Sequence, residues 1–342
     1  MKFDFVVGNP PYQEETIGEN KSFAPPVYHL FLEEAFKIGE KVEMIHPARF
    51  LFNAGSTPKA WNEKMLNDPH FKVLEYEQNS NKIFNGTEIK GGVVVSYWDS
   101  SKTFEPIKIF TPFSELNSIL KKTGRFSETE SLMSIIFAQN RFDLEKLYEE
   151  YPEFRSIIGS DGRDKRFRNN IFEKINLFAD IRTHESDIEI IGVIKNKRCR
   201  KYIPCRFLDL KHENLNYWKV LVPASNGSGA LGEIISTPLI GTPLIGYTQT
   251  FIGIGKFETE SEAQAALKYI KSKFARTMLG VLKITQHNPP ETWRFVPLQD
   301  FTASSDIDWS VSVREVDRQL YAKYGLTQEE IDFIETHVKE ME

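Results

Sequence analysis

The amino-terminal stretch of this chain constrains its fold more than any other segment. The apolar run Phe3–Gly8 (FDFVVG) has the composition of a β-strand, and it leads directly into Asn9-Pro10-Pro11-Tyr12. Each proline fixes φ at about −65° and lacks an amide donor, so the strand must end here and a restrained loop must follow. The sequence therefore predicts a strand that presents an asparagine and a tyrosine on a tight loop.

These loop residues have the chemistry to hold a planar amine. The Asn9 side-chain carbonyl and the Pro10 backbone carbonyl could accept the two hydrogens of an exocyclic amine. Acceptors held in place beforehand stabilise charge that develops only in the transition state. Tyr12 could stack on a base that has left the duplex. The alternative is that the two prolines simply end a strand and that Tyr12 packs on the surface.

In this strand context, the NPPY sequence resembles the catalytic loop of adenine N6 methyltransferases. Residues 1–105 resemble the second half of the catalytic domain of gamma-class enzymes from type II restriction-modification systems. The resemblance implies an α/β fold with a partial Rossmann-like methyltransferase sheet. It also implies S-adenosylmethionine as methyl donor and catalytic roles for Asn9, Pro10, Pro11 and Tyr12.

Later segments follow in the order that this family predicts. We expect a helix over 26–37, a strand and turn over 42–52, a helix over 59–66, and strands over 73–77 and 91–98. Between the last two strands, Asn81–Gly86 resembles the family segment whose aromatic residue contacts the flipped adenine. This resemblance assigns base contact to Phe84, and an ordinary core phenylalanine is the alternative.

The family places its donor-binding half beside the catalytic strand. Since eight residues precede Asn9, the resemblance implies that the donor-binding motifs are missing from this chain. Residues 3–7 would then form an exposed apolar strand edge, which proteins usually cover. We expect a donor-binding partner or self-association there. Phe251–Gly255 (FIGIG) imitates a donor loop but lacks the expected third glycine and helix, so we do not assign it to the donor.

Residues 126–342, after a linker at 106–125, resemble the target-recognition region of type II restriction-modification methylases. The similar segments include WKVLVP, KITQH and FVPLQDF, which begin at Trp218, Lys283 and Phe295. The resemblance implies a mixed α/β domain that binds double-stranded DNA. Thr285, Gln286 and His287 offer donors and acceptors suited to base edges, although such a cluster also occurs as a polar helix cap.

The charge distribution is compatible with specific DNA binding. A net charge of −5 argues against coating of nucleic acid, but basic residues gather in the second half of the chain. The run from Lys195 to Lys201 has five basic residues out of seven. It makes phosphate-contact candidates of Lys195, Lys197 and Arg198, and a basic helical stretch adds Arg276 and Lys283. A solvated surface is the alternative for any single run.

The remaining patterns concern location and the second domain. The sequence has neither a membrane-spanning run nor a signal peptide, and its two cysteines lack zinc-site spacing, so we expect a cytoplasmic protein without a metal or membrane partner. In the second domain we expect helices over 128–138, 144–150 and 260–282, and strands over 188–194 and 218–222, with a short strand at 106–110 before it.

These observations favour a site-specific DNA adenine N6 methyltransferase that is truncated or split and needs the donor-binding half. The alternative is a DNA-binding specificity subunit, or an inactive remnant, in which the loop persists without turnover.

Overall fold

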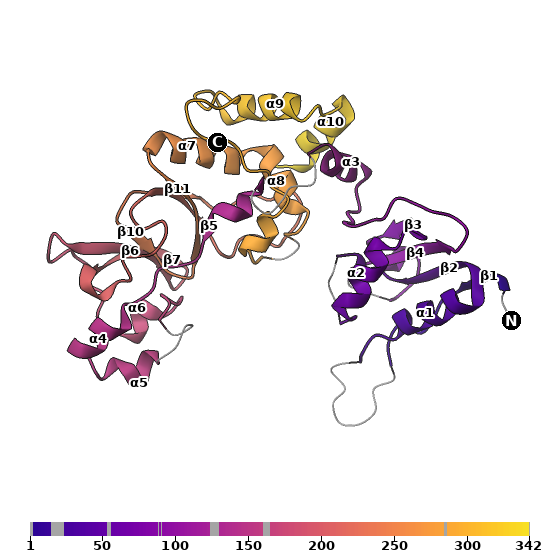
Figure 1. The fold of residues 1–342 in the computed structure, drawn as a ribbon, viewed down its shortest axis with the longest axis horizontal. Coiled ribbons are helices and arrows are strands. Elements are labelled where there is room, and N and C mark those ends of the chain that lie inside the picture. The colour runs from indigo at the N-terminus through magenta and orange to yellow at the C-terminus, as the bar shows by residue number, and fades with distance from the viewer. Residues whose placement is uncertain are drawn as a thin grey trace. The chain divides into compact units, whose positions relative to one another are not determined.

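The chain divides into two compact units, Met1–Asn117 and Ser118–Glu342. The computed structural model describes residues 3–14, 24–52, 56–87, 89, 91–123, 130–159, 165–283 and 286–341. The division falls within α3 (Ser114–Thr123), inside the stretch expected to be a linker. Both units combine helices with sheets, which confirms the predicted α/β class (Figure 1).

The first unit contains a four-stranded sheet in the order β1-β2-β4-β3. β1 runs parallel to β2, and the helix α1 connects them, which is the βαβ arrangement of Rossmann-like folds. β4 runs antiparallel to both of its neighbours. The elements of this unit are β1 (Phe3–Gly8), α1 (Tyr28–Ile38), β2 (Gly39–Pro47), η1 (Arg49–Phe52), α2 (Lys59–Asn67), β3 (Phe71–Glu77), η2 (Ser80–Lys82) and β4 (Val93–Asp99).

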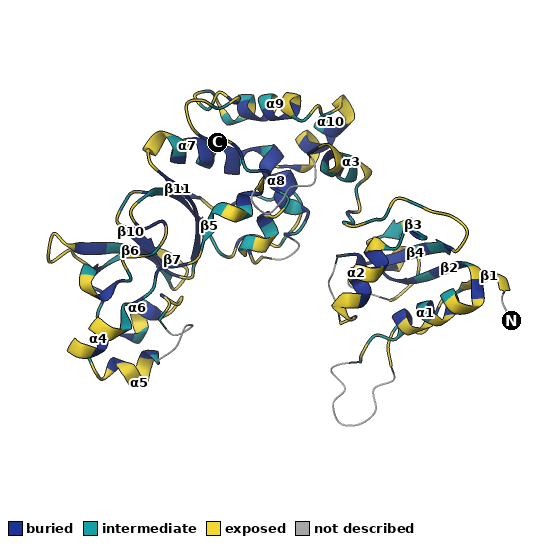
Figure 2. Cartoon of the chain, in the orientation of Figure 1, coloured by how far each residue is buried: buried dark blue, intermediate teal, exposed yellow. Residues whose placement is uncertain are grey.

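The two helices α1 and α2 bury side chains in one common core against this sheet. Tyr28 and Leu32 from α1 join Trp61 and Met65 from α2 in a cluster that also contains Val42 of β2. Neighbouring positions of a strand point to opposite faces, so residues adjacent to Val42 face away from this core. One face of the sheet is therefore buried by helices (Figure 2).

The second unit is built on two further sheets. One has the order β5-β11-β8-β9 and is antiparallel, and the other has the order β10-β6-β7. A buried cluster of Ile191, Leu221, Tyr247 and Phe251 joins them. Their strands are β5 (Ile136–Phe137), β6 (Asp187–Ile194), β7 (Lys197–Pro204), β8 (Trp218–Pro223), β9 (Leu239–Gly241), β10 (Ile245–Tyr247) and β11 (Phe251–Phe257).

The helices of the second unit fall into two groups. The first group packs on β6 and β7 and shares a hydrophobic cluster with them, and it consists of α4 (Leu144–Glu150), α5 (Phe154–Ile158) and α6 (Ile171–Lys174). The second group lies around α7, which contacts β8 and β11, and it consists of α7 (Glu260–Lys271), α8 (Lys273–Gly280), α9 (Val313–Lys323) and α10 (Gln328–His337). Short 3₁₀ turns are η4 (Leu132–Ile135), η5 (Cys205–Phe207) and η6 (Pro290–Trp293). Within the described ranges, no helix has the length and apolarity needed to cross a membrane.

Three of the expected elements are wrong. The helix expected over 260–282 is two helices, because Ser272 ends α7 and its side chain accepts a hydrogen bond from the Ala275 amide, which caps α8. Residues 106–110 form no strand, and Lys108 has φ of 56°, outside the β region. The described part of 128–138 contains η4 and β5 where an α-helix was expected.

Candidate functional site

The loops that follow β1, β2 and β3 lie at the same end of the sheet of the first unit. β1, β2 and β3 run in the same direction, because β1 is parallel to β2 while β2 and β3 are both antiparallel to β4. Pro47 at the end of β2 and Glu77 at the end of β3 both pair with Val93. The loops after all three strands therefore leave from the same end of the sheet, at the carboxyl ends of these strands, where open α/β sheets bind ligands.

The Asn9–Tyr12 loop begins at this end of the sheet, directly after β1. Gly8 packs closely on β2, since a Cβ at this position would lie 3.4 Å from the Met44 sulfur. Pro10 is buried, whereas Asn9 and Pro11 are exposed. The buried proline anchors the loop, and the Asn9 amide stays accessible to a ligand.

Tyr12 is tied to the segment that precedes α1. Its carbonyl oxygen accepts a hydrogen bond of 3.2 Å from the Val27 amide, and the Glu14 amide donates to the Pro25 carbonyl at 3.0 Å. Burial raises the pKa of the Tyr12 hydroxyl, and the nearby Asn9 side chain partly offsets this shift. The hydroxyl oxygen is buried and makes no hydrogen bond of good geometry to any described residue. The Tyr12 ring, and not its hydroxyl, is thus the group held in place.

Phe84 lies against Tyr12. The two ring centroids are 6.3 Å apart and the ring planes are inclined by 67°, an edge-to-face contact. The Phe84 amide donates to the Ser80 carbonyl at 2.8 Å. The Ser80 hydroxyl donates to the Thr87 carbonyl and accepts from the Ile89 amide, each at 2.8 Å, which closes the loop around Phe84. The structure thus brings together the two residues that the sequence predicts to contact a base.

His46 is a buried residue of β2 at the same end of the sheet. It is fully buried near the end of β2, its Nε2 lies 2.7 Å from the Ser96 hydroxyl, and its ring stacks on Tyr28 with centroids 5.4 Å apart. Burial lowers the pKa of His46 to about 4, so the ring is neutral at neutral pH. It packs against Tyr28 of α1 as a neutral ring whose two nitrogens hydrogen-bond to the Ser96 hydroxyl and the Pro47 carbonyl.

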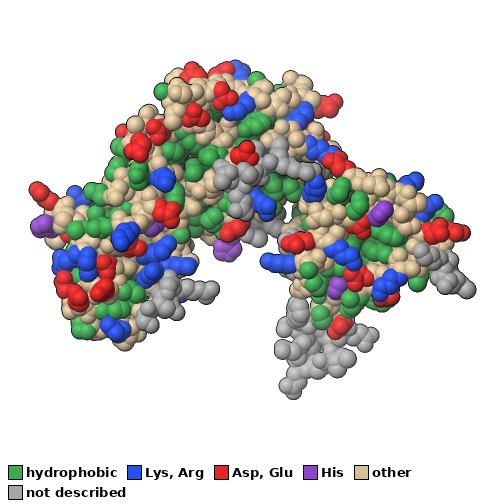
Figure 3. Space-filling model, viewed as in Figure 1, with side chains coloured by type: hydrophobic (Ala, Val, Ile, Leu, Met, Phe, Trp, Pro, Cys, Tyr) green, Lys and Arg blue, Asp and Glu red, His purple; other side chains and the backbone are tan. Residues whose placement is uncertain are grey.

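The basic residues predicted to contact DNA are only partly available. Lys195 has φ of 48° and lies at the tip of the hairpin between β6 and β7. Lys195, Lys197 and Arg198 are all exposed, and Arg198 also lies 5.6 Å from the Phe251 ring centroid and donates to the Ser236 carbonyl at 3.3 Å. On the face shown in Figure 3, lysine and arginine side chains gather over β7 and α6. DNA contact by these residues stays a prediction.

Arg276 and Lys283 do not have the placement that the sequence predicts. Arg276 is 2% exposed, and its Nε donates to the Lys271 carbonyl at 3.0 Å. Lys283 is 5% exposed, and its Nζ donates to the Asn226 carbonyl at 2.8 Å and lies 3.8 Å from the Glu233 carboxylate. This placement corrects the prediction of phosphate contacts, because both cations are buried and satisfied within the protein.

Gln286 and His287 are exposed. They lie beside a glycine-rich loop, residues 226–233, that is distant in sequence. The Asn226 amide donates to the Gln286 carbonyl at 2.7 Å, and the Ser225 hydroxyl lies 3.2 Å from His287 Nδ1. Thr285 falls outside the described residues. The two predicted base-reading side chains in the described part are therefore held on a supported surface, and their DNA contacts stay predictions.

Glu233 organises the glycine-rich loop. Its carboxylate accepts hydrogen bonds from the amides of Ser228 and Gly229 at 2.9 and 3.0 Å. Burial raises the pKa of Glu233, but the Ser228 hydroxyl and these amides outweigh burial and lower the pKa to about 2. Gly227 has φ of 63°, and a Cβ there would collide with the Glu233 carboxylate. The loop is thus folded around an ionised carboxylate.

Phe251–Gly255 does not form a donor-binding loop. Gly253 lies inside β11 and pairs with both Leu221 and Phe137, so this segment is central to a sheet. A Cβ on Gly253 would collide with the Tyr247 hydroxyl, and one on Gly255 would collide with the Phe257 ring. Side chains of the protein fill the space that the glycines leave.

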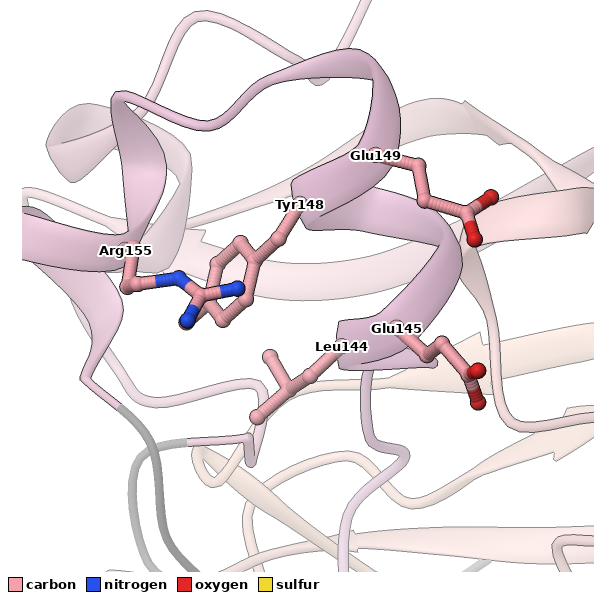
Figure 4. A pocket seen from close by; sticks show the side chains of 5 residues that line it. All are labelled: Leu144, Glu145, Tyr148, Glu149 and Arg155. Atoms are coloured by element: carbon pink, nitrogen blue, oxygen red, sulfur yellow. The ribbon is translucent and has the colours of Figure 1, made fainter.

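An open pocket of about 400 Å³ lies between α4 and α5, outside every predicted site. In Figure 4 the Arg155 guanidinium lies against the Tyr148 ring, with its central carbon 5.1 Å from the ring centroid, and Glu145 and Glu149 point away from that pair. No predicted site residue lines this pocket.

Comparisons with known proteins point to the same part of the chain. Residues 1–84 match the family model described as Eco57I restriction-modification methylase. An uncharacterized adenine-specific methylase of Mycoplasma pneumoniae (strain ATCC 29342 / M129 / Subtype 1) is 26% identical over 139 residues, which are 40% of this chain and 31% of that protein. The first unit is thus similar to restriction-modification methylases. The matched region contains the Asn9–Tyr12 loop and ends at Phe84.

Two solved structures align with most of the chain at low similarity. The type IIG restriction endonuclease BpuSI aligns with 98% of this chain and 53% of its own, with a TM-score of 0.36 and 11% identity. The type IIL restriction-modification enzyme MmeI in complex with DNA aligns with 97% of this chain and 56% of its own, with a TM-score of 0.37 and 9% identity. The chain therefore spans little more than half of each.

Sequence reasoning missed one group of charged residues. Arg141 and Arg166 pair across two segments of the second unit, although only Arg166 belongs to a basic run in the sequence. Their pairing depends on the register of two short extended segments, which no local pattern in the sequence predicts. The isolated Arg141 between Asn140 and Phe142 gave no signal.

Proposed function

We propose that the first unit carries the catalytic loop of a site-specific DNA adenine N6 methyltransferase of a restriction-modification system. The observation that carries this proposal is the contact between Tyr12 and Phe84 beside the exposed amide of Asn9. Two aromatic rings next to a polar acceptor, at the carboxyl ends of the strands of an α/β sheet, suit a flat base that bears an exocyclic amine. The similarity of residues 1–84 to restriction-modification methylases supports the same conclusion.

Each loop residue has a role in this proposal. The Asn9 side-chain carbonyl and the Pro10 carbonyl accept the two N6 hydrogens and draw the nitrogen towards tetrahedral geometry, so that its lone pair becomes available. Tyr12 and Phe84 hold the base, and Pro11 restrains the loop. When bound, S-adenosylmethionine would supply an electrophilic methyl group: the N6 lone pair would take the methyl as the bond between methyl carbon and sulfur breaks, S-adenosylhomocysteine would leave with the electron pair of that bond, and the nitrogen would lose one proton to solvent.

We also propose that a donor-binding polypeptide pairs with the free edge of β1. Phe3, Phe5 and Val7 are 48%, 64% and 74% exposed, and β1 is an edge strand of the described sheet. An apolar strand edge of this kind is normally covered by a further strand, a helix or a partner. Self-association through the same edge is the competing outcome. In the second unit, double-stranded DNA is the proposed ligand of Lys195, Lys197, Arg198, Gln286 and His287.

The experiment is the expression of the full chain in cells that lack adenine methylation, with and without a co-expressed donor-binding methyltransferase half, followed by mapping of N6-methyladenine in the genomic DNA. We expect methylation of one short sequence motif, and its loss in Asn9→Ala. Asn67→Ala is the matched control, because Asn67 is exposed at the end of α2, away from the loop, and its amide donates to the Glu63 carbonyl. Absence of N6-methyladenine in both settings contradicts the proposal.

A DNA-binding subunit without turnover is the second candidate. It is favoured by the filled space around Gly253 and Gly255, which leaves no room for a donor at the one described segment that imitates a donor loop. This candidate predicts site-specific DNA binding by the full chain with no adenine methylation in either setting.

A further inference from the structure

Two arginines lie directly opposite each other in the second unit. Arg141 and Arg166 form an antiparallel bridge between two short extended segments. The hydrogen bonds of this bridge come from the flanking residues, because the Phe142 amide donates to the Lys165 carbonyl at 2.7 Å and the Phe167 amide donates to the Asn140 carbonyl at 2.9 Å. In such a non-hydrogen-bonded pair the Cα atoms approach to about 4.5 Å and the side chains are at their closest.

The neighbouring residues show which way the two arginines point. Phe142 and Phe167 are buried in the core, with ring centroids 4.5 Å apart. Successive side chains in extended segments alternate between faces, so Arg141 and Arg166 project from the face opposite that core. Arg166 is exposed and Arg141 is half-buried. The two arginine side chains thus project from the same face of the two segments.

Within the described part of the chain one carboxylate adjoins this pair, because the register that pairs Phe142 with Leu208 places Asp209 opposite Arg141. No ion pair joins Arg141 or Arg166 to a described carboxylate. The Asp209 amide donates to the Arg141 carbonyl, and the Asp209 carboxylate accepts a hydrogen bond from the Lys211 amide and forms no ion pair with Arg141. Two other exposed arginines of this unit do have partners, since Arg206 pairs with Glu150 and Arg318 pairs with Glu315.

Like charges directly opposite each other on two strands destabilise the fold, and an anion bound between the two arginines would relieve this repulsion. Two guanidinium groups offer planar donor pairs that match phosphate oxygens. We propose that Arg141 and Arg166 form a binding site for the DNA backbone, in which the two guanidinium groups contact phosphates of the duplex. The inference rests on the proposed DNA-binding function, and it adds Arg141, which the sequence did not suggest, to Arg166, which lies in a basic run.

The test is a fluorescence titration of labelled duplex DNA with the full chain over a range of salt concentrations. Each phosphate contact contributes about 0.9 to the slope of log affinity against log salt, so Arg141→Gln/Arg166→Gln should lower the slope by about 2. The affinity loss should be similar for target and random duplexes, because phosphate contacts carry no sequence information. Arg141→Lys/Arg166→Lys should keep most of the slope.

The matched control is Arg206→Gln/Arg318→Gln, which removes two exposed arginines that pair with Glu150 and Glu315. It should leave the slope of the wild-type chain unchanged. A second readout is thermal unfolding at low salt without DNA. The Arg141→Gln/Arg166→Gln variant should unfold at a higher temperature than the wild type, because like-charge repulsion is relieved.

The outcomes separate this inference from the function on which it rests. A wild-type slope in Arg141→Gln/Arg166→Gln, with DNA still bound, overturns the phosphate site and leaves the proposed function standing. A lower unfolding temperature in that variant also overturns it, because the arginines would then stabilise the fold through contacts within the protein. Failure of the wild-type chain to bind DNA at any salt concentration overturns both.

Discussion

Tyr12 and Phe84 meet edge to face, with ring centroids 6.3 Å apart, although they belong to loops that follow different strands of the sheet. The contact exists because the carboxyl ends of β1 and β3 lie at the same end of the sheet. Each loop is fixed separately, through the Val27 amide for Tyr12 and through Ser80 for Phe84. The pair therefore forms a preorganised aromatic wall beside Asn9.

The first prediction concerns this wall. Tyr12→Ala should reduce the population of flipped base at the target adenine, since a stacking contact of this kind contributes about 1–3 kcal/mol. The measurement is the fluorescence of 2-aminopurine placed at the target position, which rises when the base leaves the duplex. Tyr12→Phe is the control. It should behave like the wild type, because the Tyr12 hydroxyl has no hydrogen-bond partner of good geometry among the described residues.

Phe84→Ala extends this test. If both rings hold the same base, Tyr12→Ala and Phe84→Ala should be non-additive in a double-mutant cycle. Additive effects would mean that Phe84 is an ordinary packing residue, which is the alternative that the sequence left open.

The first unit could be predicted from the sequence because its signals are local. A strand that ends in Pro-Pro, an amphipathic α1 and the β-branched β4 each have a characteristic spacing. The burial of Arg276 and Lys283 could not be predicted in this way. The sequence of their helical segment predicts a basic surface. Only the folded structure shows that the glycine-rich loop approaches this segment, so that its Glu233 carbonyl accepts from Arg276 and its Asn226 carbonyl accepts from Lys283.

The second prediction concerns pH and His46. Its pKa is lowered to about 4 in the folded protein, against about 6.5 in an unfolded chain. Above pH 6.5 the ring is neutral in both states, so its full contribution to stability is present. As pH falls from 6.5 towards 4, the unfolded chain binds a proton that the folded chain does not. The free energy of unfolding should then decrease by up to about 1.4 kcal/mol per pH unit.

Calorimetric unfolding of the full chain between pH 7.5 and 5 measures this effect, with His46→Phe as the comparison. The variant should lose the part of the pH dependence that His46 causes, because phenylalanine can stack on Tyr28 but cannot be protonated. Equal pH dependence in the two proteins would contradict the assignment.

The third prediction follows from the placement of Arg276 and Lys283. Arg276→Met and Lys283→Met should each lower the unfolding temperature of the chain, because backbone carbonyls of the second unit lose their donors, at a cost of about 1–3 kcal/mol. Neither variant should change the salt dependence of DNA affinity. Lys197→Met, an exposed lysine on β7, is the control with the opposite expectation: unchanged stability and a smaller salt slope. A reduced slope in Lys283→Met would restore the original sequence prediction for that residue.

The fourth prediction concerns the free edge of β1. The register pairs Phe5 with Lys41 and Val7 with Glu43, so Phe5 and Val7 lie on the same face as these charged residues, and Lys41 Nζ lies 4.8 Å from the Phe5 ring centroid. Val7 is 74% exposed, so Val7→Lys should change the stability of the first unit little. It should, however, abolish pairing of β1 with a donor-binding strand or with a second copy, because edge lysines oppose strand addition.

Analytical ultracentrifugation of the full chain, alone and with the candidate donor-binding polypeptide, measures this pairing. The matched control is Ile181→Lys, which places the same charge on a side chain that is 75% exposed in the second unit. Val7→Lys should remove the larger species and Ile181→Lys should retain it. A species of the same mass in all three proteins would show that assembly does not use β1. A difference confined to Val7→Lys would assign the interface to this edge, because the two variants differ in the position of the new charge and not in its kind.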